Sequence, residues 1–345
     1  MEPVFLIRSV REDDLEPLYR LSELVYFINL PSDKELLKEK IQTSIKSFGD
    51  EIEDKFEREY IFVMENLLDH TLVGSSMVIA RHGSPTSPHM YFKLKEIQKY
   101  SESIHAGFIH KLLRLSFDYD GPTEIGGLVL VPELRKHRAK LGRQLSYARF
   151  LFIKMRRRWF KNYILSELMP PLTESGESVL WESLGRRFTN LSYQEADLLS
   201  RKNKEFVTSL FPRGDIYTCL LSGDARDAIG KVGAEAGPVK HMLENIGFRW
   251  REHIDPFDGG PHYWAETDKI LPIRQAKKLV LQPEPLKRRQ KEDMLIAISR
   301  GAEVLCVQSH AEIVRSRVSL PRSVHEALSL TEEDAVYTMP LELTS

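Results

Sequence analysis

The densest group of side chains able to bind charge lies between residues 131 and 143. The apolar stretch Glu124–Val131 precedes this segment, and an apolar helical pattern begins near Leu141. Basic side chains fill the segment: Arg135, Lys136, His137, Arg138, Lys140 and Arg143. A helix N-terminus has backbone N–H groups without intrahelical acceptors, so a basic loop that leads into one suits a diphosphate. A solvated basic loop without a ligand is the alternative that these residues alone leave open.

Two acidic positions offer substrate binding or proton transfer. Glu167 ends the apolar strand pattern Asn162–Glu167, where a buried carboxylate requires a charged or hydrogen-bonding partner. We therefore consider Glu167 as a ligand for a substrate ammonium or guanidinium group. The second is Asp258, which is followed by Gly259 and Gly260. This sequence predicts a tight turn, and the three residues are also a candidate substrate-binding segment.

The composition limits the class of protein. A chain of 345 residues is longer than a single hydrophobic core usually supports, so we expect two domains or one enlarged domain. Hydrophobic residues make up 42% and the formal net charge is −1, which indicates a globular chain without the basic excess of nucleic-acid-binding domains. Cys219 and Cys306 cannot form a disulfide framework, so we expect two small core residues in a reducing, cytoplasmic compartment.

Nothing in the sequence predicts insertion into a membrane. The N-terminus carries charge early and lacks the apolar core of a signal peptide. No apolar run reaches the length of about 18 residues that a membrane-spanning helix needs. The segment Arg149–Phe160 combines apolar and basic residues, and it has two interpretations: an interfacial helix, or a core helix with a basic C-terminal end. We expect neither a membrane nor a nucleic acid as a partner.

Apolar periodicity predicts alternating strands and helices. The expected strands are Val4–Val10, Tyr60–Glu65, Leu72–Ala80, Glu124–Val131, Asn162–Glu167 and Phe248–Ile254. The expected helices are Asp33–Ser47 with Ser32 as its cap, Leu141–Arg157, Ser178–Phe188 and Gly237–Ile246. For Met90–Ser116 the pattern predicts one or two strands followed by a helix.

These elements predict an α/β (α+β) fold with a mixed central sheet and flanking helices. The segments 181–185 (WESLG) and 243–247 (LENIG) are helix ends of one form, which leaves a duplicated unit open. The charge run Lys287–Asp293 is the best linker candidate, and the short strands after it predict a small C-terminal β-rich unit. We therefore expect three consecutive segments, 1–190, 191–286 and 287–345, of which the first binds the cofactor and the second contributes to the substrate pocket.

The basic segment, VPELR followed by LGRQL, resembles the acyl-CoA loop of the GNAT N-acyltransferase superfamily. Glycines in that loop let the backbone approach the CoA pyrophosphate. The loop here is longer, has Lys140 at the position of the first glycine, and keeps Gly142. The resemblance implies a GNAT-like sheet and these cofactor-binding residues: Leu128, Val129, Leu130, Arg135, Arg138, Gly142 and Arg143.

Motifs spread over nearly the whole chain resemble the arginine and ornithine N-succinyltransferase family. The most specific is IDPFDGGP at residues 254–261, and order and spacing agree at Asn29–Pro31, Tyr60–Val63, Ser146–Phe150, Trp181–Phe188 and Glu195–Asp197. The resemblance implies transfer of an acyl group, succinyl in this family, from acyl-CoA to the α-amine of arginine or an ornithine-like amine. It also implies succinyl-CoA or another acyl-CoA as co-substrate, no metal, and a homo- or hetero-oligomer.

The family's catalytic histidine has no counterpart here. Its segment Q-V-H-P corresponds to KVGA at residues 231–234, which places Gly233 at the histidine position, and two further polar family positions are Val131 and Met169. General acid–base assistance is worth about 10²–10⁴-fold, so an enzyme can survive this loss at a reduced rate. Glu167 and His241 are the candidate replacements, although His241 also fits a surface position on its helix. A catalytically inactive member that serves as a CoA-binding or regulatory partner subunit is the alternative function.

Overall fold

The computed structural model describes residues 3–24, 30–85, 87–200, 203–282 and 292–343. The chain forms two compact units: unit 1 consists of Met1–Arg81, Thr123–Asn162 and Glu266–Ser345, and unit 2 of His82–Pro122 and Tyr163–Ala265. The sequence predicted three consecutive segments, whereas these units alternate along the chain. The difference arises because strands far apart in sequence pair within each unit. The expected linker Lys287–Asp293 lies mostly outside the described residues.

Unit 1 is built on antiparallel pairing of early and late strands. Its strand order is β12-β15-β11-β14-β13-β1-β2-β3-β6, with an additional β12–β13 pairing. The bounds are β1 Phe5–Ser9, β2 Glu59–Asn66, β3 Leu72–Ile79, β6 Thr123–Leu130, β11 Lys277–Leu281, β12 Glu292–Arg300, β13 Glu303–Val314, β14 Arg317–Ser319 and β15 Ala335–Pro340. The β12–β13 pairing closes the five C-terminal strands into a ring, which leaves them without exposed edges. The β-rich C-terminal region therefore exists, and β13 joins it to β1.

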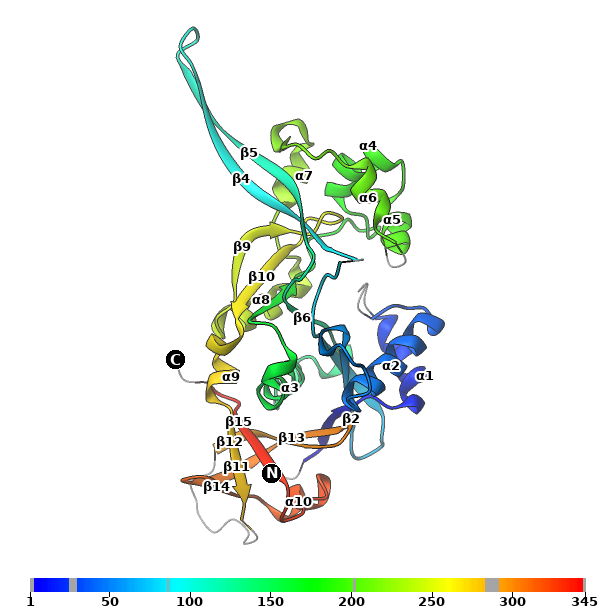
Figure 1. The fold of residues 1–345 in the computed structure, drawn as a ribbon, viewed down its shortest axis with the longest axis vertical. Coiled ribbons are helices and arrows are strands. Elements are labelled where there is room, and N and C mark those ends of the chain that lie inside the picture. The colour runs from blue at the N-terminus through cyan, green and yellow to red at the C-terminus, as the bar shows by residue number, and fades with distance from the viewer. Residues whose placement is uncertain (1–2, 25–29, 86, 201–202, 283–291, 344–345) are drawn as a thin grey trace. The chain divides into compact units, whose positions relative to one another are not determined.

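Helices cover both faces of the β1–β2–β3–β6 part of this sheet. Figure 1 shows α1 (Leu15–Ser22) and α2 (Lys34–Phe48) on one side and α3 (Leu141–Met155) on the other. Alternation along β2 explains this layering, since successive side chains point to opposite faces of a strand. Ile61 and Val63 join the core beneath α1 and α2, whereas the rings of Tyr60 and Phe62 pack on Phe152 of α3 at 4.8 and 5.3 Å.

Two sequence predictions in unit 1 require correction. Helix α2 is capped by Asp33, whose carboxylate accepts the N–H groups of Glu35 and Leu36, and not by Ser32. The interfacial-helix interpretation of Arg149–Phe160 is wrong, because the side chains of residues 149–153 and of Phe160 are buried. None of the described helices is long and apolar enough to cross a membrane.

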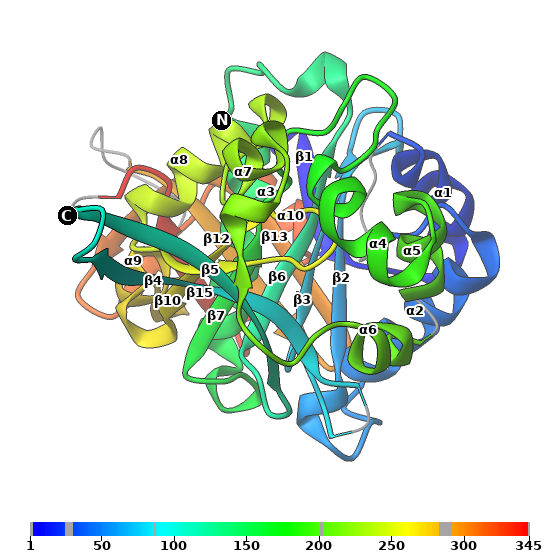
Figure 2. The same cartoon turned by 90° about the horizontal axis from the view of Figure 1, so that it is seen from above.

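Unit 2 contains the strands β7-β10-β9-β4-β5-β8 in this order. Their bounds are β4 His89–Ser101, β5 Ala106–Asp118, β7 Tyr163–Glu167, β8 Ile216–Tyr217, β9 Arg249–Ile254 and β10 Pro261–Glu266. Figures 1 and 2 show β4 and β5 side by side as a long two-stranded arm. The prediction of a helix within Met90–Ser116 is therefore wrong, because this stretch forms two strands and the turn between them. The outer half of this hairpin is largely exposed, so neither face of its strands has to be apolar. Charged and apolar residues therefore do not alternate regularly there, and the two-residue period typical of a strand is missing from the sequence.

Short helices complete unit 2 around one aromatic core. They are a π-helical segment Trp181–Gly185, α4 Arg186–Thr189, α5 Tyr193–Ser200, α6 Glu205–Leu210, α7 Gly223–Ala228 and α8 Gly237–Asn245. The indole of Trp181 is fully buried, stacks on Phe257 at 5.1 Å, and donates its Nε1 hydrogen to the carbonyl of Leu191. Cys219 is exposed and Cys306 is buried, so the prediction of two core thiols holds only for Cys306.

Candidate functional site

Strand β6 in unit 1 carries a bulge at the expected acyl-CoA position. Gly126 pairs with Met77 and Val129 pairs with Ser75, so Gly127 and Leu128 together face the single residue between their partners. Gly127 has φ +55°, and a Cβ there would lie 2.9 Å from Met77 Cγ, which explains why this position is glycine. Bulges interrupt ladder hydrogen bonding and recur beside active sites.

The basic loop leads from β6 into helix α3. Lys140 immediately before the helix has φ +54°, the left-handed conformation that a glycine adopts most easily. The next turn contains Gly142, where an added Cβ would meet nothing within 4 Å. The loop therefore keeps a glycine-like backbone at Lys140, and there is open space at Gly142 in the first helical turn.

The loop cations differ in what they contact. Arg135 donates from Nε to the carbonyl of Leu130 at 3.3 Å, and Lys140 forms an ion pair with Glu342 at 3.0 Å. Among the described residues, Lys136, Arg138 and Arg143 form no ion pair with a carboxylate. These three loop cations are therefore available to meet an external anion.

Arg149 of α3 fixes the segment of β6 next to the bulge. Its guanidinium is 2% exposed and donates to the carbonyl of Gly126 at 3.2 Å and to Ser146 Oγ at 2.8 Å. Burial lowers the pKa of Arg149 to about 9, which still leaves the side chain charged at neutral pH. The sequence motif that contains Arg149 therefore positions the bulged strand.

In unit 2, three imidazoles surround the carboxylate of Glu167 at the end of β7. The distances from Glu167 Oε1 are 3.3 Å to His262 Nε2, 3.5 Å to His89 Nε2 and 3.8 Å to His82 Nε2. His89 and His262 are buried, while His82 and Glu167 are partly exposed. We call Glu167, His82, His89, His262 and the nearby Asp255 the Glu167 cluster.

The IDPFDGGP segment supplies the acidic side of this cluster. Asp255 accepts the N–H groups of Phe257 and Asp258 at 2.7 and 3.1 Å, and Asp258 accepts the N–H of Gly260 at 2.7 Å. These bonds form the expected tight turn, with Gly259 at φ +81°. Burial, and after it the charge of Glu167, raises the pKa of Asp255 to about 7. Burial also raises the pKa of Asp258 well above its ordinary value.

Gly233, the family's histidine position, packs against the segment that follows Glu167. Its N–H donates to the carbonyl of Met169 at 2.8 Å. An added Cβ at Gly233 would lie 2.7 Å from the carbonyl oxygen of Pro170, closer than real Cβ contacts. A side chain is therefore excluded at this position unless the backbone shifts.

His241 occupies an exposed position on α8. Its ring Nδ1 lies 3.8 Å from the carboxylate of Glu244, and the side chain is 75% exposed. The structure places Glu167, the Asp258–Gly260 turn and Gly233 in one neighbourhood of unit 2, and it does not bring His241 into the Glu167 cluster.

Sequence reasoning missed His82, His89 and His262. They come from a loop and from two strand starts, so no spacing along the chain links them. Their only signal was the position of His262 directly after the IDPFDGGP motif.

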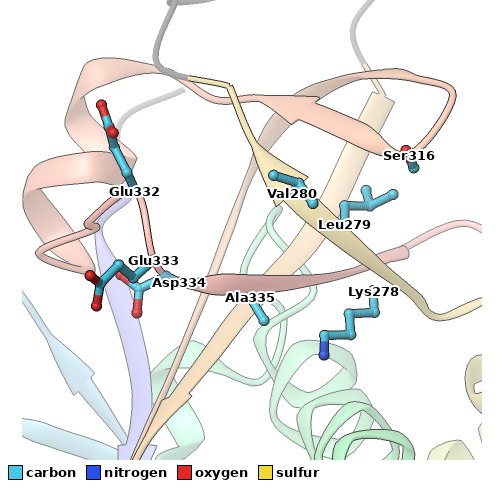
Figure 3. Close-up of a pocket in the computed structure, with 8 residues that line it drawn as sticks. All are labelled: Lys278, Leu279, Val280, Ser316, Glu332, Glu333, Asp334 and Ala335. Carbon is cyan, nitrogen blue, oxygen red and sulfur yellow. The ribbon is translucent and has the colours of Figure 1, made fainter.

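A pocket of about 270 Å³ lies elsewhere, in the C-terminal strands of unit 1. Lys278, Leu279 and Val280 of β11 line it together with Ser316 and residues 332–335 (Figure 3). Its Asp334 is already bound by Arg300, whose Nε donates at 2.8 Å. None of the sequence-predicted site residues lines this pocket.

The bulged strand, the basic loop and helix α3 define the class of the fold as a GNAT-like N-acyltransferase, as the sequence predicted. The model of the family described as arginine N-succinyltransferase beta subunit matches residues 5–272. The arginine N-succinyltransferases of Shigella dysenteriae and Escherichia coli are each 32% identical over 277 residues, which is 79% of this chain and 79% of each relative. The chain therefore belongs to the arginine N-succinyltransferase family.

A solved structure agrees with this assignment. The structure of arginine/ornithine succinyltransferase subunit AI from Pseudomonas aeruginosa is 26% identical, with a TM-score of 0.85 over 99% of both chains. The α/β (α+β) fold class predicted from the sequence is thus confirmed.

Proposed function

We propose that the protein transfers the succinyl group of succinyl-CoA to the α-amine of arginine. In this reaction the neutral amine nitrogen forms a bond to the thioester carbonyl carbon, and the carbon–sulfur bond breaks. The amine loses a proton and the leaving CoA thiolate gains one. The products are N2-succinylarginine and free CoA. The family assignment supports this choice of reaction, and the relatives give the inactive-subunit alternative no support.

The bulge at Gly127–Leu128 is the observation that carries the proposal. A bulge turns main-chain groups away from the neighbouring strand, and hydrogen-bond donors directed at a carbonyl oxygen stabilise the charge that develops there during acyl transfer. We assign the main chain of Leu128, Val129 and Leu130 to the acyl and pantetheine parts of succinyl-CoA. This assignment does not depend on side-chain identity.

The loop and the start of α3 are assigned to the pyrophosphate. Arg138 and Arg143 supply charge-assisted hydrogen bonds to phosphate oxygens, and Arg135 supports the loop through Leu130. The N-terminus of α3 adds its dipole and its first N–H groups. Open space at Gly142 fits the close approach of a ligand.

Unit 2 is assigned to the amine substrate. Glu167 and the Asp258, Gly259 and Gly260 turn supply carboxylates and backbone polar groups that suit an ammonium or guanidinium group. Since Gly233 has no side chain, Glu167 is our candidate for accepting the amine proton. Both cysteines are free, which fits a reducing, cytoplasmic location.

A thiol-release assay tests the proposed function. The purified full-length chain is mixed with succinyl-CoA and arginine or ornithine, and free CoA is followed with a thiol reagent. We expect release that depends on the amine. The Arg138→Ala and Arg143→Ala variants should each raise KM for succinyl-CoA about tenfold or more, because a hydrogen bond to a charged group contributes about 1.5–3 kcal/mol.

The matched control is Arg322→Ala. This arginine of unit 1 is 89% exposed and pairs only with Glu326 on its own helix among the described residues, so its removal should leave KM unchanged. Amine-dependent CoA release that is absent with both amines would reject the proposed function.

A further inference from the structure

The Glu167 cluster contains more polar groups than its own contacts satisfy. Neither ring nitrogen of His262 has a hydrogen-bond partner among the described residues, although the side chain is 0% exposed. Buried polar groups are nearly always hydrogen-bonded, so such an exception requires an explanation. His262 Nε2 lies 3.3 Å from Glu167 Oε1, and the imidazole is thus directed into the cluster.

The distances in the cluster lie at or beyond the upper end of hydrogen-bond lengths and are close to the separations between metal ligands. Hydrogen bonds of this kind measure about 2.7–3.2 Å, whereas the three imidazoles lie 3.3–3.8 Å from Glu167 Oε1. Two ligand atoms of a tetrahedral Zn²⁺ site with bonds of about 2.0–2.1 Å are about 3.3 Å apart. The side chains are therefore spaced for an ion between them.

Two overlapping triads of donor atoms share Glu167. They are His82, His89 and Glu167, and Glu167, Asp255 and His262, and the donor atoms within each triad lie within 4.8 Å of one another. The two carboxylates of the second triad are partly buried and repel each other, and Lys204 is the lysine that acts on both of them. A bound divalent cation would offset this repulsion.

We propose that, in the chain without amine substrate, the Glu167 cluster binds one divalent transition-metal ion, with Glu167 as the shared ligand and with nitrogen ligands from His82, His89 and His262. Imidazole nitrogen favours Zn²⁺ and related ions over Mg²⁺ and Ca²⁺, which prefer oxygen. The partial exposure of His82 and Glu167 provides a route of entry.

The test measures metal binding on the full-length chain without an affinity tag. Protein purified without chelators is analysed for bound zinc, and metal-free protein is titrated with ZnCl₂ by calorimetry. We expect one equivalent of zinc per chain. Cobalt substitution should produce visible d–d absorption that the chain without metal lacks.

Three variants locate the site. Glu167→Gln and His262→Gln should each weaken zinc affinity at least tenfold, since loss of a ligand costs at least as much as loss of a supporting partner. His105→Asn removes an exposed histidine from the turn of the β4–β5 hairpin and should leave zinc affinity unchanged. If the Gln variants do not fold, the visible spectrum of the cobalt-loaded wild type still reports nitrogen and oxygen ligation.

Two results would overturn the inference. One is the absence of any saturable zinc site in the titration, as expected if the cluster holds only the ammonium or guanidinium group of a substrate. The other is a zinc site that His105→Asn removes and Glu167→Gln does not. Because these measurements need no turnover, their failure is distinguishable from failure of the acyltransferase proposal.

Discussion

Each unit buries a group of charged side chains, and the two groups differ in how their hydrogen bonds are completed. In unit 1, Arg8 donates to Glu65 at 2.8 Å and to both oxygens of Asp14 at 2.7 and 2.8 Å. In unit 2, the imidazoles around Glu167 remain at 3.3–3.8 Å, and His262 lacks a hydrogen-bond partner among the described residues. The first group is closed on itself, and the second is open.

This comparison shows that burial of charge alone does not identify a functional site. The Arg8 group is at least as buried as the Glu167 cluster, yet its donors and acceptors satisfy one another, which is what a structural ion pair requires. An open cluster costs stability unless a ligand completes it. Completion of hydrogen bonds is therefore our criterion for distinguishing the structural ion pair from the proposed binding site.

The largest expected effect is on the closed group. Arg8→Met leaves the carboxylates of Asp14 and Glu65 buried without their cation, which should lower the free energy of unfolding by about 3–5 kcal/mol. Arg11→Met, the control, breaks an exposed ion pair with Glu303 at 3.0 Å and should cost at most about 1 kcal/mol. Urea denaturation of both variants measures the difference, and equal losses would remove the distinction between the two pairs.

A smaller effect is expected in the open cluster. Burial disfavours the charge of Glu167, but His262, His82 and Lys204 favour it and lower its pKa on balance, so the metal-free Glu167→Gln variant should lose clearly less stability than Arg8→Met. Thermal unfolding in the presence of a chelator measures this. A melting temperature lowered as much as by Arg8→Met would show that Glu167 is a structural ion-pair partner.

A further contrast concerns two glycines. Gly233→Ala places a Cβ 2.7 Å from the Pro170 carbonyl oxygen and should destabilise the chain by about 1–3 kcal/mol, as overpacking does. Gly142→Ala meets no atom within 4 Å and should leave stability unchanged or raise it by up to about 1 kcal/mol through helix propensity. Chemical denaturation compares them, and a neutral Gly233→Ala would mean that this position is not closed to a side chain.

The smallest effect concerns the two thiols. Burial raises the pKa of Cys306 to about 12, so this thiol is protonated and shielded at pH 8, whereas Cys219 is exposed. An aromatic disulfide reagent should therefore label one thiol in the native chain and two after denaturation. Rapid labelling of both native thiols would contradict the packing around Cys306.

The sequence was sufficient for the family and for the local elements with a clear apolar period. The hairpin of β2 and β3 and the strand β6 followed by α3 were predicted because each has a strong apolar period and turn residues at its ends. The interleaved units were not predicted, since pairings such as β1 with β13 join residues far apart in sequence. The β4–β5 hairpin was not predicted either, because charged and apolar residues do not alternate regularly along it.

For the candidate site, the sequence led to the prediction of Glu167, the Asp258 turn and the basic loop, each from residue type beside a recognisable element, and these assignments stay predictions. The three histidines were not predicted, because they lie at unrelated positions along the chain and only the tertiary fold brings them to Glu167. The sequence also could not show that Gly233 is sterically closed, which depends on the carbonyl oxygen of Pro170.

The most direct test of the contrast between closed and open groups is a crystal structure of the full-length chain grown with zinc, measured at the zinc absorption edge. The account predicts one anomalous peak about 2.0–2.2 Å from the Glu167 carboxylate and from imidazole nitrogens of the cluster, and none at Arg8. A cluster without an anomalous peak, with His262 still lacking a partner, would contradict it.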